Sequence, residues 1–214
     1  MESYYQKLNT DISEERTIMN DWLEIDNLRN AILSLEFSVE CLEKVHENNF
    51  NWKWVIIGIH NAFQSYMVLA LRGSNPVNIM REKDAEEWLK AYEEKSKLPE
   101  YKLDTFLNLY KKIKSDRMMM YTNSKKFTPK DSEEKSVKRL NRLRNEFMHY
   151  KLGGWVIQIG GLPGITLDIL NIISFLANDS ENVFWSDSTF KDQTNKLLSK
   201  GRSYISIINL PGEK

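Results

Sequence analysis

Three residues near position 145 carry the side-chain types needed for proton transfer and for binding phosphate oxygens. They are Arg144, Asn145 and His149, in the pattern R-N-x-x-x-H. An imidazole exchanges a proton near neutral pH, and a guanidinium presents a planar fork of N–H donors that matches two oxygens of a phosphate. An amide can orient either group by hydrogen bonding. Arg144, Asn145 and His149 are therefore the candidate catalytic residues.

The three residues fall late in a segment with the periodicity of an amphipathic helix. Its apolar stripe consists of Leu140, Leu143, Phe147 and Tyr150. His149 points almost opposite to that stripe, Asn145 lies one turn before it on the same outward face, and Arg144 lies on the flank. No second acid or base is close in the sequence. A second copy of the helix would supply one, so we predict a symmetric homodimer with the motif helices facing each other.

A purely structural interpretation of these residues is also open from the sequence. A cation near the C-terminal end of a helix is stabilised by the helix dipole, and Arg144 could cap the helix or pair with an acid on the first helix. The R-x-x-x-x-H spacing is short and arises often by chance.

A polar cluster interrupts the apolar segment 52–71. His60 and Gln64 lie one helical turn apart in it, and Asn61 follows His60. The cluster is either a buried hydrogen-bond network or a functional layer, whose side chains support the motif helix or contact a base of the substrate. The candidate substrate-binding or supporting residues are His60, Asn61, Gln64, Lys138 and Arg142.

The spacing of the metal-ligating residue types predicts no metal site and no cofactor. His46, His60 and His149 are scattered along the chain. Cys41 is the only cysteine and lies between apolar residues, where we expect it to fill the core.

Charge is unevenly distributed along this chain of 214 residues with a formal net charge of zero. Residues 1–50 carry eleven acidic side chains against four basic ones, whereas residues 111–151 carry thirteen basic against five acidic. A basic segment can bind a polyanion such as RNA, although charge runs on helices are often only solvated faces. Lys138 and Arg142 belong to this basic segment.

The elements that position these residues are predicted to be helices, because apolar residues recur at spacings of three and four and the chain has only 9 Gly and 5 Pro. The expected helices are 13–47, 52–71, 84–92, 105–114, 131–150, 166–177 and 189–208. Asp131 or Ser132 is the expected cap of the motif helix, and 156–163 an irregular connector. We predict an all-α, antiparallel helical bundle of four to five main helices plus short extra helices. It forms a single domain over 1–214, frayed at 1–12 and 209–214.

No segment predicts export or membrane insertion. Residues 1–11 are charged and lack the apolar core of a secretory signal. The apolar stretches 55–59 and 66–71 are far shorter than the roughly 20 residues needed to cross a bilayer. We expect a cytosolic protein without membrane contact.

The R-N-x-x-x-H pattern, late in an amphipathic helix of an all-helical chain of this size, resembles the HEPN superfamily, the higher-eukaryote and prokaryote nucleotide-binding domains. The likeness extends to a plasmid- and mobile-element-associated HEPN family and spans roughly residues 20–175. It is carried by WKWVIIGIHNAFQ at 52–64, RNEFMHY at 144–150, Gly154-Trp155 and Gly161-Leu162-Pro163.

The resemblance implies a metal-independent endoribonuclease that acts as a homodimer, as many HEPN proteins do, in the role of a toxin or defence effector. It implies that Arg144 and His149 of both copies share one interface cleft, with Asn145 orienting the substrate or the imidazole. An antitoxin or another protein is a further partner that it allows. A related toxin subfamily has a modified tyrosine two residues after the histidine. Position 151 is Lys here, so that regulation is not carried over.

Two other functions are compatible with the same residues. One is a catalytically silent HEPN module that binds RNA, a nucleotide or a protein partner. The other is a structural helical adaptor. RNA cleavage that is lost when His149 is replaced would identify the endoribonuclease and exclude these two functions.

Overall fold

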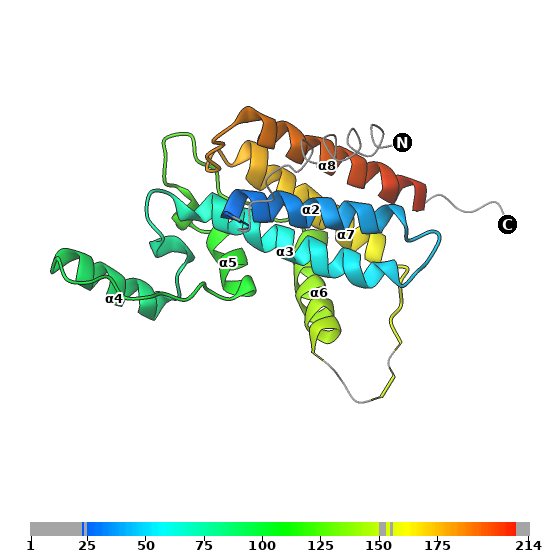
Figure 1. Cartoon of the computed structure of the whole chain (residues 1–214), viewed down its shortest axis with the longest axis horizontal. Helices are drawn as coiled ribbons and strands as arrows, with labels where there is room; N and C mark the ends of the chain where they lie inside the picture. The colour runs from blue at the N-terminus through cyan, green and yellow to red at the C-terminus, as the bar shows by residue number, and fades with distance from the viewer. Residues whose placement is uncertain (1–22, 24, 150–152, 155, 209–214) are drawn as a thin grey trace, which may run out of the picture.

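The computed structural model describes residue 23 and residues 25–149, 153–154 and 156–208. Within these ranges the chain is all-α, with one isolated bridge between Met80 and Leu103 and no strand. The α-helices are α2 (Asn27–Glu43), α3 (Asn51–Arg72), α4 (Glu82–Glu93), α5 (Phe106–Ile113), α6 (Asp131–Met148), α7 (Leu162–Ser174) and α8 (Ser188–Ile208), with short helical turns η1 (Val77–Ile79), η2 (Asp116–Met118) and η3 (Phe175–Asp179). The predicted all-α bundle is confirmed (Figure 1).

An antiparallel pair, α2 and α3, runs through the middle of the bundle (Figure 1). Most of α3 is buried, as expected of a helix that is apolar on nearly every side. Gly58 permits the close approach of the two helices, because a Cβ at this position would lie 3.0 Å from Cβ of Ser38. Ser38 also donates a buried hydrogen bond of 3.0 Å to the Val55 carbonyl. The pair is the scaffold on which the other helices pack.

The helices α7 and α8 lie along α2 and α3, whereas α6 crosses α3 and its C-terminal end extends away from the bundle (Figure 1). A buried hydrogen bond of 2.8 Å between the hydroxyls of Tyr66 and Thr194 ties α3 to α8. The middle of α6 packs through Val137, Leu140 and Leu143, which are fully buried, and the residues after Leu143 are half-buried or exposed. The end of α6 that carries the candidate residues is therefore at the edge of the core.

The observed helix bounds correct several predicted ones. The described part of the first helix begins at Asn27 because the Asp26 side chain accepts the Arg29 N–H at 2.7 Å and caps the helix there. The predicted start at 13 and the predicted frayed ends at 1–12 and 209–214 lie outside the described residues. The helix predicted to start at 166 begins at Leu162, with Pro163 in the first turn, where it needs no hydrogen-bond partner.

The predicted caps of α6, Asp131 and Ser132, are wrong by one or two residues. Lys130 occupies the cap position, and its backbone N–H donates to Oε2 of Glu133 at 2.7 Å. Asp131, Glu133 and Glu134 lie in the first turn, where the helix dipole stabilises them.

One described helix, α3, is long and apolar enough to cross a membrane by length and composition. Of its most apolar 18-residue stretch, 72% is buried inside the structure. The core helix of a bundle meets the same criteria, so α3 carries no argument for a membrane span.

Candidate functional site

The candidate catalytic residues lie at the C-terminal end of α6. Arg144 is half-buried and donates from Nη1 to Oδ1 of Asn145 at 3.0 Å. Among the described residues no carboxylate pairs with Arg144 within 4.0 Å. Its guanidinium is thus oriented by an amide and keeps its charge available to an anion. The ion pair with an acid of the first helix, which the sequence left open, is absent from this part of the chain.

His149 follows the last helical residue and has an exposed side chain. Its backbone N–H still donates to the Asn145 carbonyl at 3.0 Å, but its φ and ψ of −97° and 117° are extended. The prediction that the helix continues to Tyr150 is therefore wrong at His149, and Tyr150 lies outside the described residues. Gly153, with a φ of +96°, follows closely and suits a chain that is leaving a helix.

His60 is buried and contacts the motif helix, as both interpretations of the polar cluster require. Its Nε2 lies 3.3 Å from Oδ1 of Asn141 on α6, and its ring stacks on Phe106 of α5 with centroids 4.0 Å apart. His60 is buried and so joins α3, α5 and α6 at one point. Asn141 precedes Arg144 by three residues and lies on the same side of α6.

The electrostatics of this junction favour a neutral His60. Burial lowers its pKa to about 4, against the opposing effect of the hydrogen bond to Asn141, and the nearby charge of Arg144 lowers it further. A neutral imidazole next to Arg144 adds no like charge. The positive charge of Arg144 can therefore persist in a half-buried position.

The other predicted supporting residues are not gathered at this junction. Asn61 is exposed and donates to the Ser34 hydroxyl on α2 at 2.7 Å, because one residue along α3 turns the side chain by about 100° away from His60. Gln64 is half-buried on α3, one turn further along. Lys138 and Arg142 are exposed on α6, and Lys138 forms an ion pair of 3.3 Å with Glu134.

Two contributors to the site were missed by the sequence analysis. Asn141 could have been found from its spacing of three residues before Arg144. Phe106 could not, since it comes from a helix far away in the sequence and carries no polar signal. Packing alone brings it against His60.

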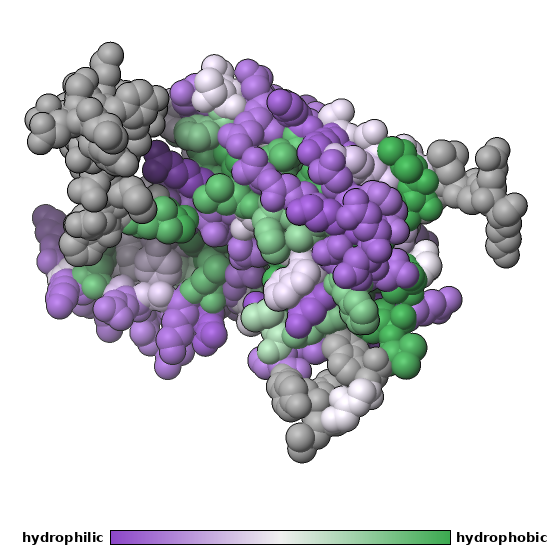
Figure 2. All heavy atoms as spheres, turned by 45° about the vertical axis from the view of Figure 1, so that its right-hand side comes forward, coloured by the Kyte–Doolittle hydropathy of each residue, from purple (hydrophilic) through white to green (hydrophobic). Residues whose placement is uncertain are grey.

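Beside the motif helix the surface is hollowed into an apolar groove of about 460 Å³. Its lining residues are Asn49, Phe50, Trp52, Lys53, Trp54, Phe147, Ile157, Ile159 and Leu162. We call this the Phe147 groove. Figure 2 brings this end of the molecule forward and shows hydrophobic residues (green) exposed among hydrophilic ones (purple). Phe147 belongs to the groove, whereas Arg144, Asn145 and His149 do not line it.

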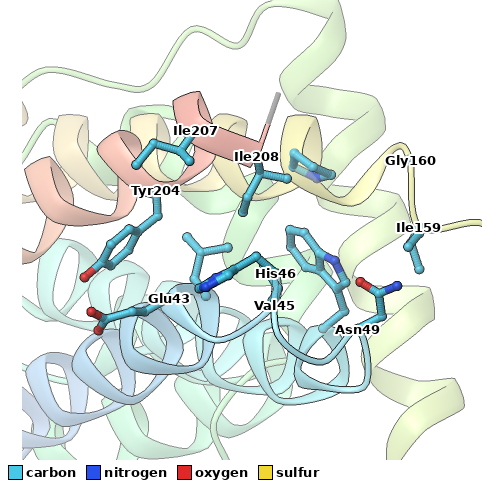
Figure 3. Close-up of a pocket in the computed structure, with 12 residues that line it drawn as sticks. Glu43, Val45, His46, Asn49, Ile159, Gly160, Tyr204, Ile207 and Ile208 are labelled. Atoms are coloured by element: carbon cyan, nitrogen blue, oxygen red, sulfur yellow. The ribbon is translucent and has the colours of Figure 1, made fainter. Parts of the chain in front are cut away.

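A second cavity, of about 650 Å³, lies between the end of α2, the start of α7 and the end of α8 (Figure 3). Ile207 and Ile208 supply apolar walls, and Glu43 and Tyr204 face each other at one side (Figure 3). Hydrogen bonds from Tyr204 and Lys200 lower the pKa of Glu43. None of the candidate catalytic residues lines this cavity.

Within the described residues, no group of three or more His, Cys, Asp and Glu side chains is placed to hold a metal ion. Cys41 is buried, as expected of a core cysteine.

No protein-family model, curated protein or solved structure matches the chain. The HEPN resemblance therefore continues to rest on the residues that carry it.

Proposed function

We propose that the protein is a metal-independent endoribonuclease whose site combines Arg144, Asn145 and His149 from two copies of the chain. The observation that carries the proposal is the set of contacts made by the Arg144 guanidinium. Its guanidinium is held by Asn145 at 3.0 Å, has no carboxylate partner among the described residues, and shares a helix end with an exposed histidine. This combination suits a phosphate group better than it suits a structural ion pair.

The reaction that these groups fit uses the substrate's own 2′-hydroxyl. His149 of one copy takes the proton as the 2′-oxygen forms a bond to phosphorus, and His149 of the second copy gives a proton to the 5′-oxygen as the P–O5′ bond breaks. Arg144 donates to the non-bridging oxygens, where negative charge increases in the transition state. The products carry a 2′,3′-cyclic phosphate and a 5′-hydroxyl. A role as a toxin or defence effector follows from the HEPN resemblance alone.

The supporting layer contributes by position. His60 holds Asn141 from the side of α3, and Asn145 holds the guanidinium of Arg144. Both contacts restrict the part of α6 that bears the proposed site. Oriented donors of this kind stabilise a transition state without reorganising at the moment of reaction.

The test is cleavage of a single-stranded RNA oligonucleotide by the purified protein in the presence of EDTA. We expect cyclic-phosphate and 5′-hydroxyl ends, and no cleavage of DNA or of 2′-O-methyl RNA, because these lack a nucleophilic 2′-hydroxyl. Cleavage of DNA, or a loss of activity in EDTA that magnesium restores, would overturn the mechanism. Bound but intact RNA would instead identify an RNA-binding module.

A further inference from the structure

The residues from 80 to 104 leave the bundle as an arm that carries α4. Figure 1 shows α4 lying apart from the packed helices, and its main neighbour is η1. Ala85 is the only buried residue of α4. The arm therefore adds little to the hydrophobic core of its own chain.

The base of the arm is nevertheless held firmly. The two chain segments pair there, with Asp104 N–H donating to the Ile79 carbonyl at 2.9 Å and the bridge between Met80 and Leu103 beside it. Lys112 of α5 forms a buried ion pair of 2.7 Å with Asp104 and donates to the Met80 carbonyl. A buried, hydrogen-bonded ion pair fixes geometry, so the arm is presented in a defined direction.

One face of α4 is apolar, and several of its side chains are exposed. Ala85, Trp88, Leu89 and Tyr92 follow the spacing of a single helix face. Trp88 and Tyr92 stack with nearly parallel rings 5.5 Å apart, and Leu89 and Tyr92 are 42% and 64% exposed. Clustered exposed apolar groups of this kind mark protein interaction sites, and Trp and Tyr are frequent anchors in them.

The charge of the arm restricts its partner. α4 carries five acidic residues and two lysines, so an apolar surface with a basic surround fits it best. The Phe147 groove has this character. Phe50 and Trp54 are 85% and 46% exposed there, and Lys53 is the only charged side chain among the described residues that line the groove. The adjoining α6 carries five basic side chains at 135–144, with one acidic residue, Glu146, between them and Phe147.

The arm and the groove of one chain cannot meet. Figure 1 places α4 at one end of the molecule and the α2–α3 turn, which contributes Phe50 to the groove, at the other end. We propose that α4 of one copy docks its Leu89 and Tyr92 face into the Phe147 groove of a second copy, and the second arm does the same in return. Two reciprocal contacts close a two-fold dimer. This inference rests on the two-copy assembly of the proposed function.

Three variants of the chain test this exchange of arms. Light scattering or sedimentation, without RNA, measures whether each variant is a monomer or a dimer. Leu89→Glu/Tyr92→Glu alters the arm, Phe50→Glu alters the groove, and Phe184→Glu is the control, since Phe184 is 84% exposed and belongs to neither surface. We expect dimers for the wild type and the control. The arm and groove variants should each raise the dissociation constant about 10- to 100-fold. Circular dichroism verifies that all variants keep their helical content.

The decisive measurement mixes the arm variant with the groove variant. A mixed dimer retains one intact arm and one intact groove, so the mixture should recover dimers that neither variant forms alone. A monomeric wild type, undiminished dimerisation of either variant, or no recovery in the mixture would overturn the exchange. The mass measurements contain no RNA, so they test the arm contact separately from the nuclease activity. If the variants dimerise as expected but the wild type does not cleave RNA in the separate assay, the proposed nuclease is wrong and the arm contact still holds.

Discussion

His149 and Arg144 differ in what their replacement should disturb. The exposed His149 side chain contributes nothing to the core, whereas Arg144 is half-buried and bonded to Asn145. A variant at His149 therefore reports on chemistry, and a variant at Arg144 reports on chemistry and packing together.

We expect His149→Ala to lower the rate of RNA cleavage about 10²- to 10⁴-fold, the usual cost of losing a positioned acid or base, with unchanged thermal unfolding. The measurement is single-turnover cleavage of an RNA oligonucleotide. His46→Ala is the matched control, because its imidazole is 69% exposed and lies outside the motif. Equal rates for both variants and the wild type would remove His149 from the mechanism.

The pKa of His60 predicts a pH dependence of stability. Burial lowers the pKa of this imidazole to about 4, against an ordinary value of 6.5. The unfolded chain therefore binds more protons between these values, so the stability from neutral His60 is complete above pH 6.5 and is lost as the pH falls toward 4. The loss amounts to about 3 kcal/mol.

Urea unfolding at a series of pH values measures this effect. The free energy of unfolding of the wild type should fall between pH 6.5 and 4, and His60→Gln should lack His60's share of that fall. Parallel curves for the two proteins would show that His60 does not titrate in this window.

At the scale of elements, the arm depends on one buried ion pair. Burial by itself raises the pKa of Asp104, but hydrogen bonds from Lys112, Asn108 and the Thr105 N–H outweigh it and hold that pKa below its ordinary value. Without Lys112 the carboxylate would remain buried while the cation that pairs with it is gone.

Lys112→Met should therefore destabilise the protein by about 3 kcal/mol, since removing one partner of a buried pair leaves an uncompensated charge. Lys111→Met is the control, because Lys111 is exposed and adjacent in the same helix. Its change should stay within about 0.5 kcal/mol. Urea unfolding at pH 7 compares the two, and similar stabilities would show that the pair does not hold the arm.

The exposed side of α6 should act as a phosphate track if RNA is the substrate. Binding to single-stranded RNA should weaken with salt, and Arg142→Glu should reduce the slope of log affinity against log salt by about 0.7 for each phosphate that the variant no longer neutralises. Lys196→Glu on α8 is the control, since Lys196 is exposed and belongs neither to the motif helix nor to the arm. Fluorescence anisotropy measures both. An affinity that does not change with salt would show that the basic side chains of α6 do not contact the phosphates of RNA.

At the scale of the whole molecule, the proposed site needs two copies of the chain. Adding increasing amounts of the His149→Ala variant to a fixed amount of the wild-type protein should lower the cleavage rate, because a mixed dimer holds only one of the two imidazoles that the reaction uses. The measurement is the cleavage of an RNA oligonucleotide after the two proteins have had time to exchange chains. A rate that does not change as the variant is added would place a complete site within one chain.

The sequence by itself determined the all-α class, most helix positions and the side of α6 that faces the core. These features depend on interactions between residues that are close in the sequence, because the spacing of the apolar residues indicates which face of a helix is buried. The same local pattern put Asn145 on the outward face of α6 and Arg144 on its flank, and both side chains are half-buried in the structure. Helix ends were less certain, as Asp26 and His149 show, because capping and backbone geometry at a terminus depend on single side chains and on the chain that follows.

Only the tertiary structure decided which helices meet. It brought His60 to Asn141 and Phe106, turned Asn61 toward α2, and left α4 outside the bundle with the Leu89 and Tyr92 face exposed. A helical period gives the direction of a side chain but not the identity of its partner. That identity is set by packing between elements that are distant in the sequence, as in the contact of His60 with Asn141 across 81 positions.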